Sequence, residues 1–123
     1  MVKPSVLIVD DDAILLRALD RGLRRRAEDW DLTFVDGGEL AERALESHAF
    51  DVVVTDLRMR EPGTEVLACA RRALPHAVRV MMTSERIDFR DFDAHVVLEK
   101  PMSLQTFEDM LEAAVAVARV LAG

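Results

Sequence analysis

The stretch VLIVDDD at residues 6–12 is the most informative part of the sequence, because four apolar residues run directly into three aspartates. A continuous apolar run of this kind is typical of a strand that is buried on both faces, as in a parallel sheet. Residues 13–26 follow with leucines at helical spacing and arginines between them, which predicts an amphipathic helix. The chain therefore opens with a buried strand, an acidic strand end and a helix.

The same alternation continues along the chain. Further strands are predicted at residues 32–35, 52–55, 78–82 and 95–98, and further helices at residues 39–47, 64–72 and 103–121. Leu40, Ala44 and Leu45 are expected to face the core, and Ser103 is a suitable N-cap for the last helix. Such alternation predicts an α/β fold in which helices cover both faces of a parallel sheet. By length, residues 1–123 are expected to form a single domain.

The composition is that of a soluble globular protein, with 50% hydrophobic and 32% charged residues. No stretch approaches the roughly 18 apolar residues of a membrane helix, and no secretory signal is recognisable. We therefore expect a cytoplasmic protein without a membrane partner. The net charge of −7 argues against direct binding of nucleic acid through a general basic surface. The single Cys69 is interpreted as a small buried hydrophobe.

Charged or reactive side chains follow four of the five predicted strands. They are Asp10, Asp11 and Asp12 after the first strand, Asp56 after the third, Thr83 and Ser84 after the fourth, and Lys100 after the fifth. Open parallel sheets bind ligands beyond the carboxyl ends of their strands. We therefore expect these side chains to meet at one edge of the sheet.

The chemistry of this group is coherent. Carboxylates that cluster repel one another, by about 4 kcal/mol per pair at 4 Å and an effective dielectric constant near 20, so they need a cation. Hard oxygen ligands favour Mg²⁺, which takes one or two carboxylates and completes its shell with water and phosphate. A remaining carboxylate can act as a nucleophile and form an aspartyl phosphate. The cation, a lysine and a hydroxyl would stabilise the transferred group.

At these residues the sequence resembles the response-regulator receiver domain of two-component systems, over essentially its whole length. The matching pieces are VLIVDDD at 6–12, DVVVTDLRM at 51–59, VRVMMTS at 78–84 and EKP at 99–101. The resemblance implies a flavodoxin-like, doubly wound five-stranded parallel sheet in the order 2-1-3-4-5. It implies a signalling domain rather than an enzyme, with only self-catalysed phosphoryl transfer and slow autodephosphorylation.

The resemblance also implies partners and a cofactor. The phosphoryl group would come from a sensor histidine kinase or a phosphotransfer protein, in a reaction that depends on Mg²⁺. The signal would pass to a downstream protein or to a fused output domain. A homodimer is also compatible, since dimers in this family often use the surface around the helix between strands four and five.

Residue by residue, the resemblance implies the following roles. Asp56 matches the phosphoacceptor, and Asp10 and Asp11 match the acidic pair that holds Mg²⁺ together with Asp56 and the backbone carbonyl of Arg58. Thr83 matches the hydroxyl that turns toward the phosphoryl group, and Lys100 matches the lysine that pairs with it. Arg58 and Glu85 match positions that flank the path of attacking water. They could form a salt bridge over the site or remain two solvated side chains.

Three features depart from the family pattern. The loop after the acceptor, with residues 60–63, is one residue shorter than usual, which leaves the metal geometry at the Arg58 carbonyl open. Only the 16 residues 84–99 separate Thr83 from Lys100, so the family's fourth helix should be short or missing, or the segment a mobile loop. Val97 stands where the family usually has an aromatic switch residue, and its stiff side chain cannot make that movement. We therefore expect an atypical output surface, either at residues 84–94 or elsewhere.

Two other functions remain open on the sequence. VLIVDDDAIL also resembles the opening motif of haloacid-dehalogenase-type phosphatases, with Asp10 as nucleophile and Asp12 as acid and base, but a further acidic pair near the last strand is lacking. The chain could also be a phosphorylation-independent pseudo-receiver that acts as an interaction module. A trapped adduct on Asp10 would indicate the phosphatase. A melting temperature that ignores Mg²⁺ would favour the interaction module.

Overall fold

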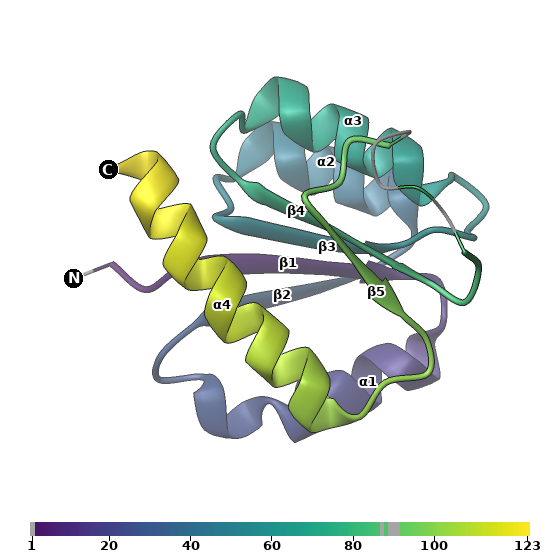
Figure 1. The fold of residues 1–123 in the computed structure, drawn as a ribbon, viewed down its shortest axis with the longest axis horizontal. Helices are drawn as coiled ribbons and strands as arrows, with labels where there is room; N and C mark the ends of the chain where they lie inside the picture. The colour runs from purple at the N-terminus through teal and green to yellow at the C-terminus, as the bar shows by residue number, and fades with distance from the viewer. Residues whose placement is uncertain (1, 87, 89–91) are drawn as a thin grey trace.

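Five parallel strands form one sheet in the order β2-β1-β3-β4-β5, as the computed structural model shows for residues 2–86, 88 and 92–123 (Figure 1). The strands are β1 (Ser5–Asp10), β2 (Asp31–Asp36), β3 (Val52–Asp56), β4 (Val78–Thr83) and β5 (Val96–Glu99). The strand order therefore reverses at β1, which lies between β2 and β3. The predicted flavodoxin-like sheet is confirmed, with strand bounds that differ from the prediction by no more than one residue.

Four α-helices in the described ranges cover the two faces of this sheet. They are α1 (Ala13–Gly22), α2 (Gly38–Ser47), α3 (Gly63–Ala73) and α4 (Leu104–Ala122), with a short 3-10 turn, η1 (Arg24–Arg26), after α1. Helices α2 and α3 lie side by side on one face, and α1 and α4 lie on the other (Figure 1). None of these helices combines the length and apolar character needed to cross a membrane.

The connection between β4 and β5 was expected to have a short helix or none. Its described residues, 84–86, 88 and 92–95, are not helical. Residues 87 and 89–91 of the same segment lie outside the described residues. Helix α4 therefore follows β5 directly and corresponds to the last helix of the predicted order.

The core has two layers, one on each face of the sheet. Val6 and Ile8 of β1 face α1 and α4, whereas Leu7 and Val9 face α2 and α3. All four side chains are fully buried. Alternate residues of one apolar run thus pack in opposite layers, which is the reason why a strand in the middle of a parallel sheet has no polar face.

Two details of the helices bear on the predictions. Leu40, expected to face the core, is 48% exposed, and Ala41 and Leu45 occupy the inner line of α2 instead. Successive residues of a helix are rotated by about 100° around its axis. An assignment of the inward face that is wrong by one residue therefore turns Leu40 away from the core. Ser103, by contrast, is the N-cap of α4, and its Oγ accepts from the Thr106 amide at 3.0 Å.

Helix α1 ends at Gly22, earlier than the predicted residue 26. A Cβ atom at Gly22 would lie 2.6 Å from Leu104 Cδ2, so the start of α4 packs directly on this backbone. The tighter turn at Arg24–Arg26 then directs Arg25 toward α4, where its Nη2 lies 2.6 Å from Oε2 of the buried Glu108. The end of α1 therefore lies at a contact between distant parts of the chain.

Candidate functional site

The site lies at the carboxyl edge of the sheet, where four strands end together. The backbone continues to pair just beyond the strands. The Leu57 amide donates to the Met82 carbonyl at 2.9 Å, and the Lys100 amide donates to the Thr83 carbonyl at 2.9 Å. These hydrogen bonds fix the loops after β3 and β5 relative to β4. Side chains that are far apart in the sequence are therefore held in one place by main-chain geometry.

Three aspartates form an acidic cluster at this edge. One carboxylate oxygen from each of Asp10, Asp11 and Asp56 lies within 4.8 Å of the others. Asp10 is only 1% exposed and Asp56 9%, whereas Asp11 is exposed to solvent. The Nζ of Lys100 lies 3.3 Å from Asp10 Oδ2 and 3.1 Å from Asp56 Oδ1. The structure therefore brings together the acidic residues and the lysine that the sequence singled out.

The cluster carries more negative than positive charge. Three carboxylates share one ammonium group, and two of the three are buried. Burial raises the pKa of the Asp56 carboxyl and Asp10 raises it further, while the hydrogen bond from Lys100 opposes both. Burial lowers the pKa of Lys100, but the hydrogen bond to Asp56 and the charge of Asp10 outweigh it and leave that pKa raised. An all-oxygen donor set with excess negative charge fits Mg²⁺.

Asp12, the third aspartate of the motif, has a different task. Its Oδ1 accepts from the amides of Ile14 at 3.0 Å and Leu15 at 3.1 Å, so it caps the start of α1. Its own amide donates to Asp10 Oδ1 at 3.0 Å and helps to orient that carboxylate. The capping role was not predicted, although an aspartate directly before a helical pattern is a typical N-cap signal.

Thr83 closes β4 beside the acidic cluster. It is almost fully buried, and its Oγ1 accepts from the Glu85 amide at 3.0 Å. Its neighbour Met82 pairs with Asp56 in the register of β3 and β4. The hydroxyl therefore lies one residue beyond the strand position that pairs with Asp56.

Arg58 and Glu85 form the salt bridge that the sequence left as one of two alternatives. The Nε–Oε1 and Nη2–Oε2 distances are both 2.7 Å, so the pair is bidentate. Each partner stabilises the charged form of the other, which raises the pKa of Arg58 and lowers the pKa of Glu85. The bridge joins the loop after β3 to the loop after β4, and both side chains are exposed.

Gly63 closes the loop after Asp56, a role that was not predicted from the sequence. A Cβ atom at Gly63 would lie 2.1 Å from the carbonyl oxygen of Asp56. The Gly63 amide also donates to the Leu57 carbonyl at 2.9 Å. Only glycine allows the first turn of α3 to approach the Asp56 backbone so closely. A glycine at the start of a helix after a short loop was the available signal.

Val97 lies in the middle of β5, opposite Met81 of β4. It is partly buried and packs against the core layer under α2 and α3. The position that the family resemblance assigns to a switch residue is therefore part of the packed sheet.

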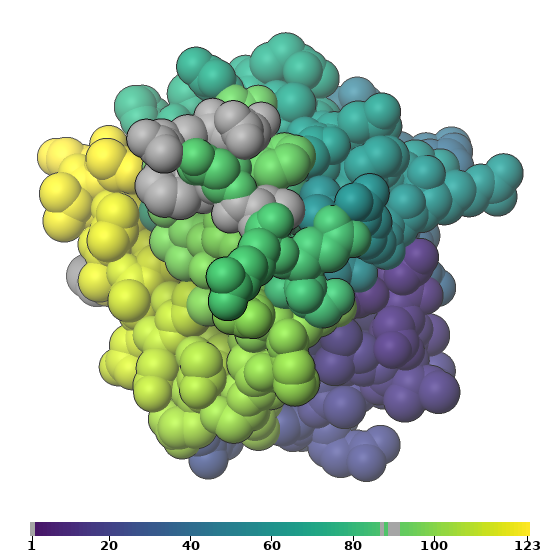
Figure 2. Space-filling view, turned by 45° about the vertical axis from the view of Figure 1, so that its right-hand side comes forward, coloured from purple at the N-terminus to yellow at the C-terminus, as the bar shows by residue number. Residues whose placement is uncertain are grey.

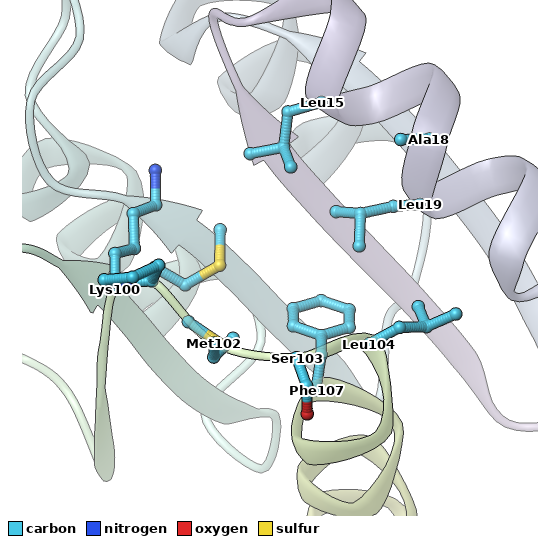
Figure 3. Close-up of a pocket in the computed structure, with 10 residues that line it drawn as sticks. Leu15, Ala18, Leu19, Lys100, Met102, Ser103, Leu104 and Phe107 are labelled. Atoms are coloured by element: carbon cyan, nitrogen blue, oxygen red, sulfur yellow. The ribbon is translucent and has the colours of Figure 1, made fainter.

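An apolar groove of about 510 Å³ adjoins the acidic cluster on the α1 side. It lies between α1 and the start of α4, with Leu15 and Leu19 on one wall and Met102 and Phe107 on the other (Figure 3). Lys100 borders the groove with its aliphatic stem, while its Nζ points away from Phe107 (Figure 3). The groove was not predicted from the sequence.

Comparison with known proteins places this site in a family. The family model for the response regulator receiver domain matches residues 6–112. The transcriptional regulatory protein PrrA of Mycobacterium tuberculosis is 35% identical over 91 residues, which are 74% of this chain and 38% of PrrA. The chain thus spans about two fifths of the length of that relative.

Solved structures agree with this match. The crystal structure of adenylate cyclase from Rhodopirellula baltica is 26% identical, with a TM-score of 0.85 over 98% of this chain and 93% of that chain. The response regulator TrrA from Thermotoga maritima, in complex with Mg²⁺ and BeF, shares the fold at 22% identity, with a TM-score of 0.77 over 90% of this chain and 98% of that chain. The chain therefore belongs to the response-regulator receiver domain family.

Proposed function

We propose that Asp56 accepts a phosphoryl group from a sensor histidine kinase or a phosphotransfer protein, in a reaction that requires Mg²⁺. The observation that carries this proposal is the position of Lys100, whose ammonium bridges the carboxylates of Asp10 and Asp56 at 3.3 and 3.1 Å. With Asp11 at the rim, this arrangement offers a nucleophile, a cation and an acidic pocket in one place. The TrrA structure, which holds Mg²⁺ and BeF, supports the proposal.

The residues of the chain divide the work of phosphoryl transfer. A carboxylate oxygen of Asp56 attacks the phosphorus of a phosphohistidine, a phosphorus–oxygen bond forms, and the phosphorus–nitrogen bond breaks. The leaving ring nitrogen keeps the electron pair of that bond and takes up a proton from water. Lys100 pairs with the charge on the transferred group, and the Thr83 hydroxyl turns toward it.

The acidic pocket fits a divalent cation through its oxygen donors. Asp10, Asp11 and Asp56, together with the backbone carbonyl of Arg58, would hold Mg²⁺. The bound ion supplies positive charge to the phosphoryl oxygens. The Arg58 side chain is occupied by Glu85 at the edge of the site. We infer that this pair modulates the access of water and thereby the lifetime of the aspartyl phosphate.

The phosphodonor would be a protein that reaches Asp56 from the open edge of the sheet. The groove between α1 and the start of α4 borders Lys100, so a donor of protein size would cover it. The acidic net charge of −7 speaks for protein rather than nucleic-acid partners. The domain would act in the cytoplasm on a downstream protein or on a fused output domain, as the greater length of PrrA suggests.

Output from this domain would be atypical. Val97 replaces an aromatic switch and is packed in the sheet, so the segment 84–94 is the proposed reporter of the phosphoryl state. Amide hydrogen exchange with and without beryllofluoride tests this part of the proposal. We expect exchange to change between Thr83 and Val97. Unchanged exchange throughout that segment would show that the signal leaves through another face.

A second candidate is a phosphorylation-independent interaction module, which the valine at position 97 favours. Labelling with acetyl phosphate and Mg²⁺, read by intact mass, separates the two functions. We expect one phosphoryl group on the wild-type chain and none on Asp56→Asn. A wild-type chain that stays unlabelled would support the interaction module, and a label retained by Asp56→Asn but lost in Asp10→Asn would support the phosphatase chemistry.

A further inference from the structure

Asp10 is the most buried member of the acidic cluster, and its two carboxylate oxygens have different partners. Oδ2 lies 3.3 Å from the ammonium group of Lys100, and Oδ1 accepts from the Asp12 amide at 3.0 Å. Lys100 carries its charge on a flexible stem and also contacts Asp56. The Asp12 amide belongs to the main chain, so it is the firmer of the two contacts. The orientation of Asp10 therefore depends on how the backbone of Asp12 is held.

The first turn of α1 holds the backbone of Asp12 by hydrogen bonds of two kinds. The carboxylate Oδ1 of Asp12 accepts from the amides of Ile14 at 3.0 Å and Leu15 at 3.1 Å. The carbonyl of Asp12 accepts from the Leu16 amide at 3.0 Å. Leu16 is itself buried in the core layer between α1, α4 and the sheet. A packed helix thus fixes the position from which the Asp12 amide reaches back to Asp10.

The charge of Asp12 is directed to the helix rather than to the acidic cluster. Its carboxylate meets the amides of the first turn, where the helix dipole favours a negative charge. Among the described residues, the acids whose oxygens lie within 4.8 Å of one another are Asp10, Asp11 and Asp56, and Asp12 is not one of them. Figure 2 shows the region of α1, in purple, at the surface of the molecule. Asp12 therefore acts on the acidic cluster through the hydrogen bond from its amide.

We propose that Asp12 is a positioning residue, which holds Asp10 in one orientation and thereby strengthens the binding of Mg²⁺. The inference rests on the proposed Mg²⁺ site and assigns to Asp12 no direct contact with the ion. Residues that orient the ligands of a metal commonly contribute about 10- to 100-fold to its affinity. Lys100 still contacts Asp10 when the cap is lost, so the effect of Asp12 lies at the lower end of that range.

Three variants separate the orientation of Asp10 from charge and from helix stability. Asp12→Ala removes both the cap and the charge. Asp12→Asn removes the charge but keeps an oxygen that caps a helix about as well. Ser103→Ala removes the N-cap of α4, whose Oγ accepts from the Thr106 amide at 3.0 Å. This last variant is the matched control, because it also loses one helix cap but leaves the contact between Asp12 and Asp10 intact.

A titration with Mg²⁺ alone, followed by the amide chemical shifts around the acidic cluster, measures the affinity of each folded chain. We expect Asp12→Ala to bind Mg²⁺ about tenfold more weakly than the wild type. Asp12→Asn and Ser103→Ala should stay within about threefold of the wild type, since an exposed charge is largely screened. Equal weakening in Asp12→Ala and Asp12→Asn would assign the effect to charge and overturn the proposal. An affinity of Asp12→Ala equal to that of Ser103→Ala would overturn it as well.

The side-chain rotamer of Asp10 in the metal-free protein tests the orientation directly. Three-bond NMR couplings at its β-carbon should indicate one rotamer in the wild type, in Asp12→Asn and in Ser103→Ala. In Asp12→Ala they should indicate an average over several rotamers. A single unchanged rotamer in Asp12→Ala contradicts the positioning role. A wild-type chain that binds no Mg²⁺ would contradict the proposed metal site, whereas this measurement would still decide whether Asp12 orients Asp10.

Discussion

The acidic cluster lies at the carboxyl edge of the sheet, whereas the connection between β4 and β5 ends at the amino edge, beside Arg79. The two are held in different ways. Asp10, Asp56 and Lys100 are positioned by strand ends whose backbones are hydrogen-bonded to each other. The described end of the connection has one main-chain hydrogen bond to β4, from the His95 amide to the Arg79 carbonyl at 2.8 Å, and its other contacts involve side chains. Arg79 Nε donates to the Asp93 carbonyl.

Two further contacts hold the connection. The Arg79 amide donates to His95 Nδ1 at 2.9 Å, and Arg71 of α3 forms an ion pair with Asp93 at 2.7 Å. Main-chain pairing allows few other backbone conformations. The side-chain contacts of Arg79 with Asp93 and His95, here called the His95 latch, can be broken by one proton or one substitution. We infer from the difference that the acidic cluster, the proposed site of phosphorylation, is rigid and that the connection, the proposed reporter, is more adjustable. Substitutions in the two parts should therefore have different consequences, and those at the acidic cluster should be the more severe.

Lys100→Met should have the largest effect, on the rate of phosphorylation. It removes the cation that lies 3.1 Å from Asp56, and loss of one preorganised charge from such a site costs about 10²- to 10³-fold in rate. A time course of labelling with acetyl phosphate, quenched at intervals and read by intact mass, measures this rate. Lys3→Met, at the only other lysine, is the matched control and should label at the wild-type rate. A rate for Lys100→Met within twofold of wild type would remove Lys100 from the mechanism.

Gly63→Ala tests how rigid the acceptor loop is. The added Cβ would overlap the Asp56 carbonyl oxygen, so either α3 or the acceptor backbone must move. We expect a loss of about 3 kcal/mol in the free energy of unfolding, measured with urea. Gly123→Ala, at the end of α4, should change it little. Equal stability of the two variants would mean that the loop adapts easily.

Asp56→Asn should stabilise the protein when Mg²⁺ is absent. The raised pKa of Asp56 means that the ionised form is disfavoured in the folded state, so at neutral pH its charge lowers stability. The free energy of unfolding therefore increases as the pH falls through the pKa that Asp56 has in the folded state. We expect the melting temperature of the variant to rise by about 3 °C without Mg²⁺.

The same variant also reports on the metal site. Mg²⁺ should raise the melting temperature of the wild-type chain, because it binds the folded state and neutralises the cluster. Asp56→Asn should respond less. Asp51→Asn, an acid at the other end of β3, should respond like the wild type. A wild-type melting temperature that is independent of Mg²⁺ would contradict the proposed metal site.

The acidic cluster could be foreseen because its information is local in the sequence. Apolar runs marked the strands, and polar residues directly after them marked the site, so Asp10, Asp56 and Lys100 could be grouped from the sequence alone. Strand order needed the family resemblance, since periodicity does not say which strands are neighbours. The details that were missed depend on distant contacts. Helix α1 ends at Gly22, where Leu104 packs on the backbone, and the helical spacing of the leucines does not contain that contact.

The latch at His95 should give a smaller, pH-dependent effect. Burial and the charge of Arg79 lower the pKa of His95, so protonation is disfavoured in the folded state. Above the ordinary pKa of 6.5, His95 is neutral in both the folded and the unfolded state and costs no stability. As the pH falls below 6.5, the unfolded state takes up the proton more readily, so the free energy of unfolding decreases. A proton on Nδ1 would also break the hydrogen bond from the Arg79 amide.

Amide exchange at residues 92–96, measured between pH 7.5 and 5.5, tests this expectation. We expect faster opening at the lower pH and a melting temperature reduced by roughly 2 °C, after correction for intrinsic exchange. His95→Asn keeps an acceptor near the Nδ1 position and should abolish the pH dependence. His76→Asn, at an exposed histidine, should retain it. If His95→Asn showed the same pH dependence as the wild type, protonation of His95 would be excluded as its cause.

The salt bridge between Arg58 and Glu85 should have the smallest effect, because both side chains are exposed. It spans the loops after β3 and β4 and so belongs partly to each region. Removing it with Glu85→Gln should change the lifetime of the aspartyl phosphate by less than about fivefold, since exposed ion pairs contribute little, and should leave the melting temperature unchanged. Loss of radiolabel over time measures that lifetime, with Glu65→Gln on α3 as the control. A much larger change in lifetime would show that this bridge controls the entry of water to Asp56, and that the rigid and the adjustable region are coupled through it.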